Sequence, residues 1–202
     1  MTVAATTKLQ AINIMMAAIG ETPVNTLTGT LPADVVIAQS TLTEINKDVQ
    51  SEGWSFNTEI DVTLTRDGSN HINLPKDILR VDANIHQHPT IDPIQRGLKL
   101  YDRQNNKFTF DEDLICTIVY FREFDEIPEP ARRYMTIKAA RVFVDRLVGD
   151  QGLRTYTEQD EIRARAILME TDYANADHNL LRGDPSLTNI FDTYNPSSAL
   201  IR

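Results

Sequence analysis

The spacing of apolar residues changes twice along this chain, near Gly53 and near Pro128, and these changes restrict the possible folds. Before Gly53, apolar residues recur every three or four positions, which is the period of one helix face. Beyond it, Ile60, Val62 and Leu64 alternate with polar residues, as in a half-buried strand. Helical spacing returns after Pro128. Because helices and strands are segregated rather than alternating, the sequence predicts an α+β fold.

Four segments carry a single apolar stripe each, so we expect their helices to pack together as a bundle. The first segment covers residues 6–19 and the second runs from Pro32 to about Gly53. The third covers residues 128–149, and Thr155 or Thr157 is expected to cap the fourth. The inward side chains expected for the last two helices are Met135, Val142, Phe143 and Leu147, and then Ile162, Ala166, Met169 and Tyr173. The predicted helical bundle comprises residues 1–53 and 128–182.

Residues 54–127 are expected to form an antiparallel β region inserted into this bundle, because the connections between its strands are short. The segment from Asp67 to Asn70 has the composition of a hairpin turn, so residues 72–74 are predicted to pair back onto the strand before it. A second hairpin is expected to join residues 107–110 to residues 114–121. About six strands are predicted in all.

Two further segments, the junction before the β region and the C-terminal end of the chain, have distinct sequence signals. Trp54 and Phe56 stand where a helix gives way to a strand, and we expect them to anchor that junction. At the far end of the chain, residues 183–202 contain Pro, Asn, Ser and Thr without either period, and this predicts an irregular C-terminal arm.

The composition excludes several classes of protein. The chain has 202 residues, of which 41% are hydrophobic, and a chain of this size can fold without disulfides or a structural metal. The one cysteine, Cys116, cannot form an internal disulfide, which fits a reducing compartment. No apolar run approaches the ~20 residues of a membrane span, so no membrane insertion is expected. The net charge of −9 disfavours a protein that grips nucleic acid phosphates over a broad surface.

Two groups of residues could in principle support chemistry. Acidic residues gather in two short clusters, and a carboxylate pair within one of them could act in glycoside hydrolysis; these residues are Asp111, Glu112, Asp113, Glu123, Asp125 and Glu126. His86 and His88, with His71, could approach a metal ion. Solvated acids are common in turns and no nucleophile, phosphate-loop or dinucleotide motif is present. We therefore assign no catalytic, cofactor-binding or metal-binding residue.

The third helix carries a local excess of basic residues in an otherwise acidic chain. They are Arg132, Arg133, Lys138, Arg141 and Arg146. A basic helix can bind phosphate or meet an acidic protein surface, and the acidic fourth helix is one such neighbour. Because no pattern of stacking aromatic residues accompanies the basic residues, we favour contact with protein.

Five stretches, in order along nearly the whole chain, resemble the tail tubular protein A family of short-tailed bacteriophages. They are Ile19–Gly29 after the first helix, Gly53–Asn57 at the junction, Tyr101–Arg103, Tyr120–Glu129 and Leu181–Asp184. The resemblance implies a helical body with an inserted β region. It also implies a twelvefold ring that joins the portal protein to the tail nozzle protein, tail tubular protein B. This ring would surround the channel through which DNA leaves without specific binding.

The resemblance also implies location and contact surfaces. Such a protein would assemble in the host cytoplasm and belong to the virion tail. The residues expected to contact a neighbouring copy or the portal are the five basic residues of the third helix, Thr22 and Pro23 in the loop after Gly20, and Leu187, Ile190, Phe191 and Tyr194 in the arm. Some family members have been proposed to degrade capsular polysaccharide, which leaves a glycan hydrolase as the alternative function, although no residue motif here carries it.

Overall fold

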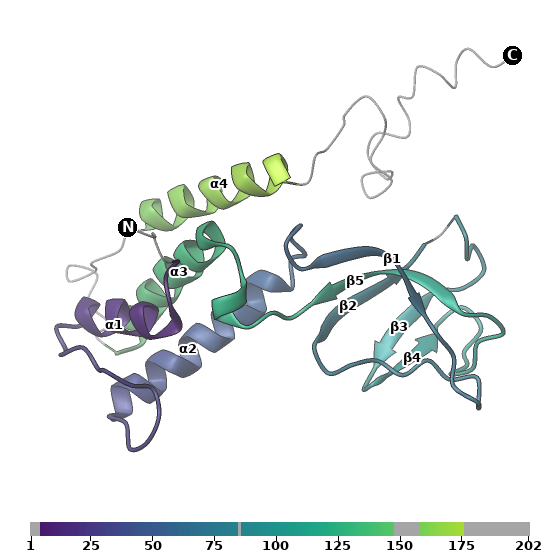
Figure 1. Cartoon of the computed structure of the whole chain (residues 1–202), viewed down its shortest axis with the longest axis horizontal. Coiled ribbons are helices and arrows are strands. Elements are labelled where there is room, and N and C mark those ends of the chain that lie inside the picture. Colours follow the sequence, from purple (N-terminus) through teal and green to yellow (C-terminus); the bar gives the residue numbers. More distant parts are fainter. Residues whose placement is uncertain (1–4, 85, 148–157, 176–202) are drawn as a thin grey trace, which may run out of the picture.

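The computed structural model describes residues 5–84, 86–147 and 158–175. The described helices are α1 (Lys8–Ala18), α2 (Ala33–Gln50), α3 (Glu129–Leu147) and α4 (Glu158–Asn175), with a short 3₁₀ helix at Phe124–Glu126. The strands are β1 (Thr58–Leu64), β2 (Ile78–Ala83), β3 (Pro93–Arg96), β4 (Lys99–Asp102) and β5 (Leu114–Tyr120). Helices therefore flank a block of strands, which confirms the α+β prediction (Figure 1).

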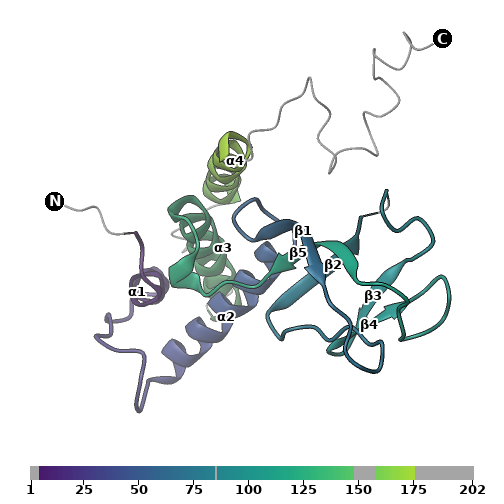
Figure 2. The ribbon, with the colours of Figure 1, turned by 45° about the vertical axis from the view of Figure 1, so that its right-hand side comes forward.

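The helical body, which we define as α1 to α4, is built around α3. This helix packs against α1, α2 and α4. In both ribbon views α3 lies between α2 and α4, so these two helices form opposite sides of the body (Figures 1 and 2). The helix starts follow local signals: the Thr7 hydroxyl accepts a hydrogen bond from the backbone N–H of Gln10, and the Gln10 side chain accepts one from the backbone N–H of Thr7.

The core of the helical body matches only part of the predicted inward faces. Met135 and Phe143 of α3 are buried as predicted, but Leu147 is exposed. On α4 the prediction was wrong, because the inward residues are Ala164 and Leu168 while the predicted stripe faces solvent. The helical period identified correctly which residues share a face, but polar contacts of α4 decide which face meets α3.

The β region, which we define as residues 58–120, consists of two small antiparallel sheets. One has the order β1-β5-β2, and the other pairs β3 with β4. Both hairpin predictions were wrong. β1 pairs with β5 rather than with residues 72–74, and residues 107–110 make isolated bridges rather than a strand. The turn at Asp67 does form, since its carboxylate accepts hydrogen bonds from the backbone N–H groups of Ser69 and His71. Turn composition predicts where the chain bends, but not which strand it pairs with.

A buried polar network joins the β region to the helical body. The Gln50 amide donates to the backbone oxygen of Arg122 and accepts from the backbone N–H of the same residue, both at 2.8 Å. The Asn57 amide donates to the backbone oxygens of Gln50 and Tyr120. Gln50 and Asn57 are almost fully buried. Because these buried amide groups form hydrogen bonds, the network fixes the two segments that connect the helical body to the β region.

Two separate apolar cores follow from this arrangement. The core of the helical body includes Trp54, Phe124 and Ile127, with Phe56 packed against it, although the predicted boundaries place these residues in the inserted region or at its edge. The core of the β region is formed by other residues, between Ile72 and Ile118. The predicted boundaries between the helical bundle and the inserted β region, at residues 53/54 and 127/128, stay a prediction.

Candidate interaction surface on α4

The basic residues of α3 form contacts within the chain, with one exception. Arg132 donates to three backbone oxygens, those of Thr6, Asp125 and Ile127, at 2.6–2.9 Å. Arg133 is exposed and makes no ion pair with another described residue. Arg132 therefore fastens the start of α3 to the segment before α1, and Arg133 keeps its charge on the surface.

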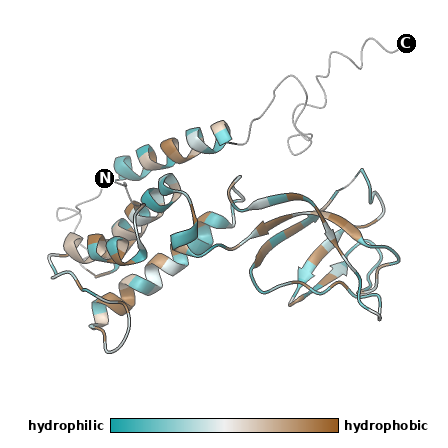
Figure 3. Cartoon of the chain, in the orientation of Figure 1, coloured by the Kyte–Doolittle hydropathy of each residue, from teal (hydrophilic) through white to brown (hydrophobic). Residues whose placement is uncertain are grey.

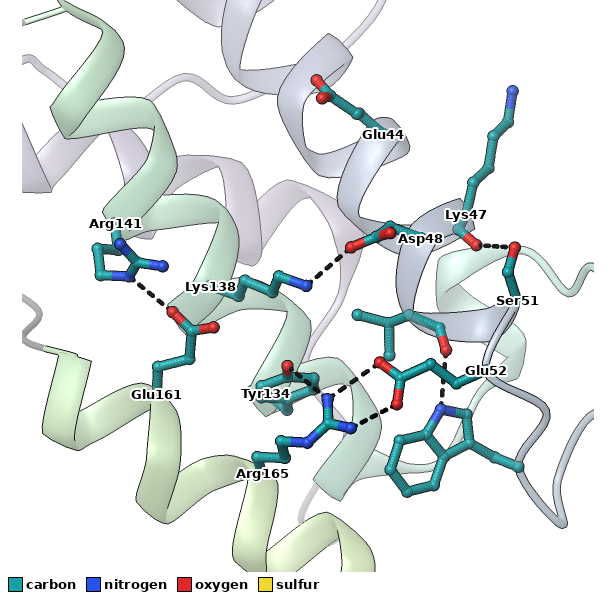
Figure 4. Close-up of polar contacts among 12 residues, drawn as sticks. Glu44, Lys47, Asp48, Ser51, Glu52, Tyr134, Lys138, Arg141, Glu161 and Arg165 are labelled. Atoms are coloured by element: carbon teal, nitrogen blue, oxygen red, sulfur yellow. Dashed lines mark hydrogen bonds and ion pairs between the residues drawn. The ribbon is translucent and has the colours of Figure 1, made fainter.

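The other three basic residues of α3 pair with acids on neighbouring helices. Lys138 bonds to Asp48 at 2.8 Å and Arg141 to Glu161 at 2.6 Å (Figure 4). Arg146 bonds to Glu44 at 2.8 Å. Burial opposes the charge of Lys138, but the hydrogen bond to Asp48 and nearby acids raise its pKa. Glu161 lies on α4, so the acidic fourth helix is one partner of the basic third helix.

Arg165 is the main contact between α4 and the junction with the β region. Its guanidinium bonds to both carboxylate oxygens of Glu52, at 2.6 and 3.0 Å, and to the Tyr134 hydroxyl at 3.1 Å (Figure 4). The same guanidinium lies 5.8 Å from the centre of the Trp54 ring. The hydrogen bonds to Glu52 and Tyr134 raise the pKa of Arg165 above its ordinary value. Asp172 adds a second contact by accepting from the backbone N–H and hydroxyl of Ser55.

α4 therefore meets the body with a mostly polar face. Glu161, Arg165 and Asp172 supply its ion pairs and hydrogen bonds, while Ala164 and Leu168 are its only buried residues among those described. This contact is short of apolar burial, which is the usual source of helix docking energy. We call Glu52, Arg165, Ser55 and Asp172 the junction clamp.

A second face of α4, beside the one that meets the body, is apolar and exposed. Ile162, Met169 and Tyr173 expose 61%, 39% and 61% of their surface, and Ala166 lies between them. These four residues, which we call the α4 stripe, recur at intervals of four, three and four, so they line one side of the helix. Figure 3 shows apolar colouring along part of this helix. An exposed, continuous row of large apolar side chains is typical of a surface that binds a partner.

The acidic clusters hold structural positions rather than a paired catalytic geometry. Asp111 bonds to Lys107 and Asp113 to Arg66, and hydrogen bonds from these partners hold the pKa of both carboxyls below the ordinary value. A general acid needs the opposite shift. Glu123 and Glu126 form a capping box around the 3₁₀ helix. Asp125 accepts a hydrogen bond from the backbone N–H of Lys8.

The histidines do not converge on a common point. His88 is buried, and its Nε2 accepts a hydrogen bond from the backbone N–H of Ile115. This bond leaves the proton on Nδ1, which lies 2.8 Å from a Glu112 oxygen. Both ring nitrogens are therefore engaged in holding β5 to the loop after β2. Among the described residues, no group of three or more His, Cys, Asp or Glu side chains could hold a metal ion.

The sequence model of tail tubular proteins matches residues 9–178, which is most of the chain and includes every described helix and strand except the start of α1. The chain belongs to the tail tubular protein family. It is therefore a structural protein of the phage tail and a component of the virion. No curated protein matches the chain. Within the described residues of this tail tubular protein, no helix is long and apolar enough to cross a membrane.

The loop between α1 and α2 is fastened to α1 through Val24, near the middle of the loop. The Asn13 side chain donates to the backbone oxygen of Val24 at 2.9 Å and accepts from its N–H at 2.8 Å. Thr22 and Pro23, which were predicted to dock onto a partner, are exposed. The remaining predicted contact residues, Leu187, Ile190, Phe191 and Tyr194, lie outside the described residues. Their role stays a prediction.

Sequence reasoning missed the junction clamp. Its four residues come from two parts of the chain more than a hundred residues apart, so no local motif contains them. The one available signal was Trp54, which we expected at the junction and which donates its indole N–H to the backbone oxygen of Val49 while lying beside Arg165. Arg165 lies one helical turn from Glu161, and the sequence alone does not indicate which residue Arg165 will bind.

Proposed function

We propose that this protein is a ring-forming adaptor of the phage tail, which joins the portal protein to the tail nozzle protein and surrounds the DNA exit channel. Twelve copies form the ring in this proposal, and assembly takes place in the host cytoplasm. The observation that carries the proposal is the exposed α4 stripe. Each isolated copy leaves Ile162, Met169 and Tyr173 in water, and packing against another copy removes that apolar surface from water.

The charge of the chain supports the proposed channel. DNA carries one negative charge per ~1.7 Å of its axis, and a lining rich in unpaired cations would hold it. Here the net charge is −9, and most basic residues of α3 are paired with acids or bonded to backbone oxygens of the same chain. A ring of such subunits repels DNA on balance, so DNA passes without specific binding.

Docking onto the portal is assigned to surfaces outside the α4 stripe. The candidates for contact with the portal or a neighbouring copy are exposed Thr22 and Pro23 in the loop before α2, exposed Arg133, and the arm with Leu187, Ile190, Phe191 and Tyr194. No observation favours a glycan hydrolase, because the acids considered for it are engaged in ion pairs, caps and backbone hydrogen bonds.

Electron microscopy of the purified protein mixed with its portal protein tests this proposal. We expect closed rings bound to one end of the portal. Ile162→Lys should abolish ring formation because it places a charge in the α4 stripe, while Ile60→Lys, at an exposed apolar residue of β1, should leave ring formation unchanged. Circular dichroism checks that both variants fold. Absence of wild-type rings with the portal, or equal ring formation by Ile162→Lys, would contradict the proposal.

A further inference from the structure

A pocket lies where the helical body meets the β region. Its volume is about 550 Å³, which is within the range of pockets that bind ligands. Four parts of the chain line it: the start of α1, the second half of α2, the loop before β2 with the start of that strand, and the segment between β5 and α3. These parts are distant in the sequence, so the pocket exists only in the folded chain.

Three lysines line this pocket. Lys8 comes from α1, Lys47 from α2 and Lys76 from the loop before β2. None of the three forms an ion pair with another described residue. Figure 4 shows the Lys47 side chain extending away from the ion pair of Lys138 with Asp48. In a chain with a net charge of −9, three ammonium groups around one pocket favour an anionic ligand.

Asn46 adds a buried hydrogen-bond donor to the pocket. The residue is 3% exposed and belongs to the pocket lining. The backbone N–H of Arg122 donates to the side-chain oxygen of Gln50, so the Gln50 amide nitrogen faces Asn46 and donates to its side-chain oxygen at 2.7 Å. The Asn46 amide nitrogen donates to no other described residue. Because a buried amide donor ordinarily has an acceptor, this nitrogen suits a ligand that brings oxygen atoms.

Hydrogen bonds hold the segments that carry the lysines. The backbone N–H of Lys8 donates to the Asp125 carboxylate at 2.9 Å. The backbone N–H of Phe121 donates to the backbone oxygen of Asp77, the residue after Lys76. The end of α2 is held by the amide bonds just described. The backbone of the pocket is thus formed before a ligand binds, which lowers the entropy cost of binding.

The rest of the lining favours a protein ligand over DNA. Leu42 and Phe124 are almost fully buried in the pocket wall, while Leu79 and Phe121 are partly exposed. An apolar side chain can cover this wall while a carboxylate beside it reaches the ammonium groups. DNA offers phosphates along a broad surface, and the acidic chain repels them on balance. Glu123 is the one acid among the described lining residues, and it takes part in the capping box of the 3₁₀ helix.

We propose that this pocket, which we call the lysine pocket, binds an acidic segment of a partner protein in the tail. Carboxylates of that segment pair with Lys8, Lys47 and Lys76, and one of its oxygen atoms accepts a hydrogen bond from Asn46. An apolar side chain next to the carboxylates covers the apolar wall. The inference rests on the proposed adaptor role, which requires the chain to bind the portal and nozzle proteins.

Binding of the full-length chain to purified portal protein and to purified nozzle protein, measured by biolayer interferometry, tests the lysine pocket. Lys47→Glu and Lys76→Glu should each weaken binding to one of these proteins by about tenfold or more, because each places a carboxylate beside those of the partner. The matched control is Lys99→Glu, which makes the same charge change at an exposed lysine of β4 and should alter binding by less than about twofold. Circular dichroism checks that all three variants fold.

Asn46→Asp tests the buried donor separately. Aspartate keeps the oxygen that accepts from Gln50, but it replaces the amide donor with a negatively charged acceptor. We expect this variant to bind the same partner about tenfold more weakly, because the new carboxylate repels those of the ligand. Wild-type affinity in the folded variant would overturn the contact proposed for Asn46. If the buried charge unfolds the chain, the two exposed lysine variants decide the proposal.

The outcomes separate the lysine pocket from the adaptor role. If the wild-type chain binds a partner and the two lysine variants bind it equally well, or Lys99→Glu weakens binding as much as they do, the lysine pocket is overturned and the adaptor role stands. If the two variants lose affinity only for a fluorescent DNA duplex, the pocket binds phosphates and the proposal is likewise overturned. Absence of wild-type binding to both proteins would overturn the adaptor role, and the lysine pocket with it.

Carbodiimide crosslinking identifies the bound segment directly, because the reagent joins a lysine amine to a carboxylate in contact with it. In the complex with the bound partner, mass spectrometry should find Lys8, Lys47 or Lys76 joined to an acidic residue that lies next to an apolar one. Crosslinks from these lysines to acids of a second copy of this chain would overturn the proposal. Crosslinks to the partner that involve none of the three lysines would overturn it as well.

Discussion

The core of the helical body contains 21 described buried residues, whereas the core of the β region contains nine. The carboxylates show the reverse distribution. Of the five described carboxylates whose pKa is lowered, Asp67, Asp102, Asp111 and Asp113 lie in the β region and only Glu44 in the helical body. The comparison indicates that apolar burial holds the helices together, while polar turn contacts contribute much more to the sheets.

Truncation of the helical core should give the largest effect. Phe143 is fully buried among α-helical neighbours, so Phe143→Ala should lower the free energy of unfolding by about 3–5 kcal/mol. The matched control is Leu147→Ala on the same helix, where the side chain is exposed and the change should stay within about 0.5 kcal/mol. Urea unfolding of both variants measures the difference. Equal effects would show that the sequence-based assignment of Leu147 to the core was right.

Loss of a turn carboxylate should be the next largest effect and should be confined to the β region. The Asp102 carboxylate accepts hydrogen bonds from the Asn105 side chain and from the backbone N–H groups of Gln104 and Asn105. Asp102→Ala should cost about 1–3 kcal/mol because it leaves these donors without their acceptor. Asp102→Asn, which keeps one acceptor oxygen, should cost less. Amide exchange that rises in the helical body as much as in β3 and β4 would contradict this division.

Removal of the junction clamp should have a smaller effect, on α4 alone. Arg165→Ala deletes the bonds to Glu52 and Tyr134, and since the side chain is partly exposed we expect a loss of about 1 kcal/mol. Amide exchange in α4 should accelerate while α1, α2 and α3 keep their protection. Arg163→Ala, which removes only a weak contact to Asp160, should change neither. Unchanged α4 exchange in Arg165→Ala would show that Ala164 and Leu168 suffice to hold the helix.

Acid should affect the β region first. Backbone hydrogen bonds from His71 and Ser69 lower the pKa of Asp67, and one from Arg66 lowers that of Asp113; at Asp102 burial opposes, but hydrogen bonds from Asn105 and its neighbours prevail. A carboxylate with a lowered folded pKa stabilises the fold above its unfolded pKa of about 3.9, and this contribution disappears as the pH falls through the folded value.

We therefore expect constant stability from pH 7 to about 5 and loss below about pH 4, as unfolded carboxyls begin to bind protons. Nuclear magnetic resonance spectra recorded along an acid titration should lose the signals of the β region before those of α1 to α3. Loss of both sets at the same pH would show that the buried contacts of Gln50 and Asn57 couple the two regions into one unit.

The sequence predicted the parts of the fold that depend on neighbours in the chain. The spacing that includes Ile12 and Met16 was enough to predict α1, because the helical period is local. The pairing of β1 with β5 could not be predicted, since it joins residues 50 to 61 positions apart whose alternation fits several partners. Apolar spacing defines a face of a helix or strand, but it does not identify the element that packs against that face.

The candidate surface illustrates the same limit. Ile162, Met169 and Tyr173 were identified correctly as one stripe, yet the stripe faces solvent because Arg165 and Asp172 hold a different face of α4 on the body. Their partners Glu52 and Ser55 lie more than a hundred residues away in the chain. A stripe predicted for the core of one chain thus became the candidate contact between chains, and only three-dimensional contacts could show the difference.

The most direct test of this account is a cryo-electron microscopy reconstruction of the protein assembled on its portal, at a resolution that shows side chains. The account predicts a closed ring in which Ile162, Met169 and Tyr173 are buried against the adjacent copy. A ring in which these three side chains still face solvent, with copies joined elsewhere, would contradict the central claim that α4 is the assembly surface.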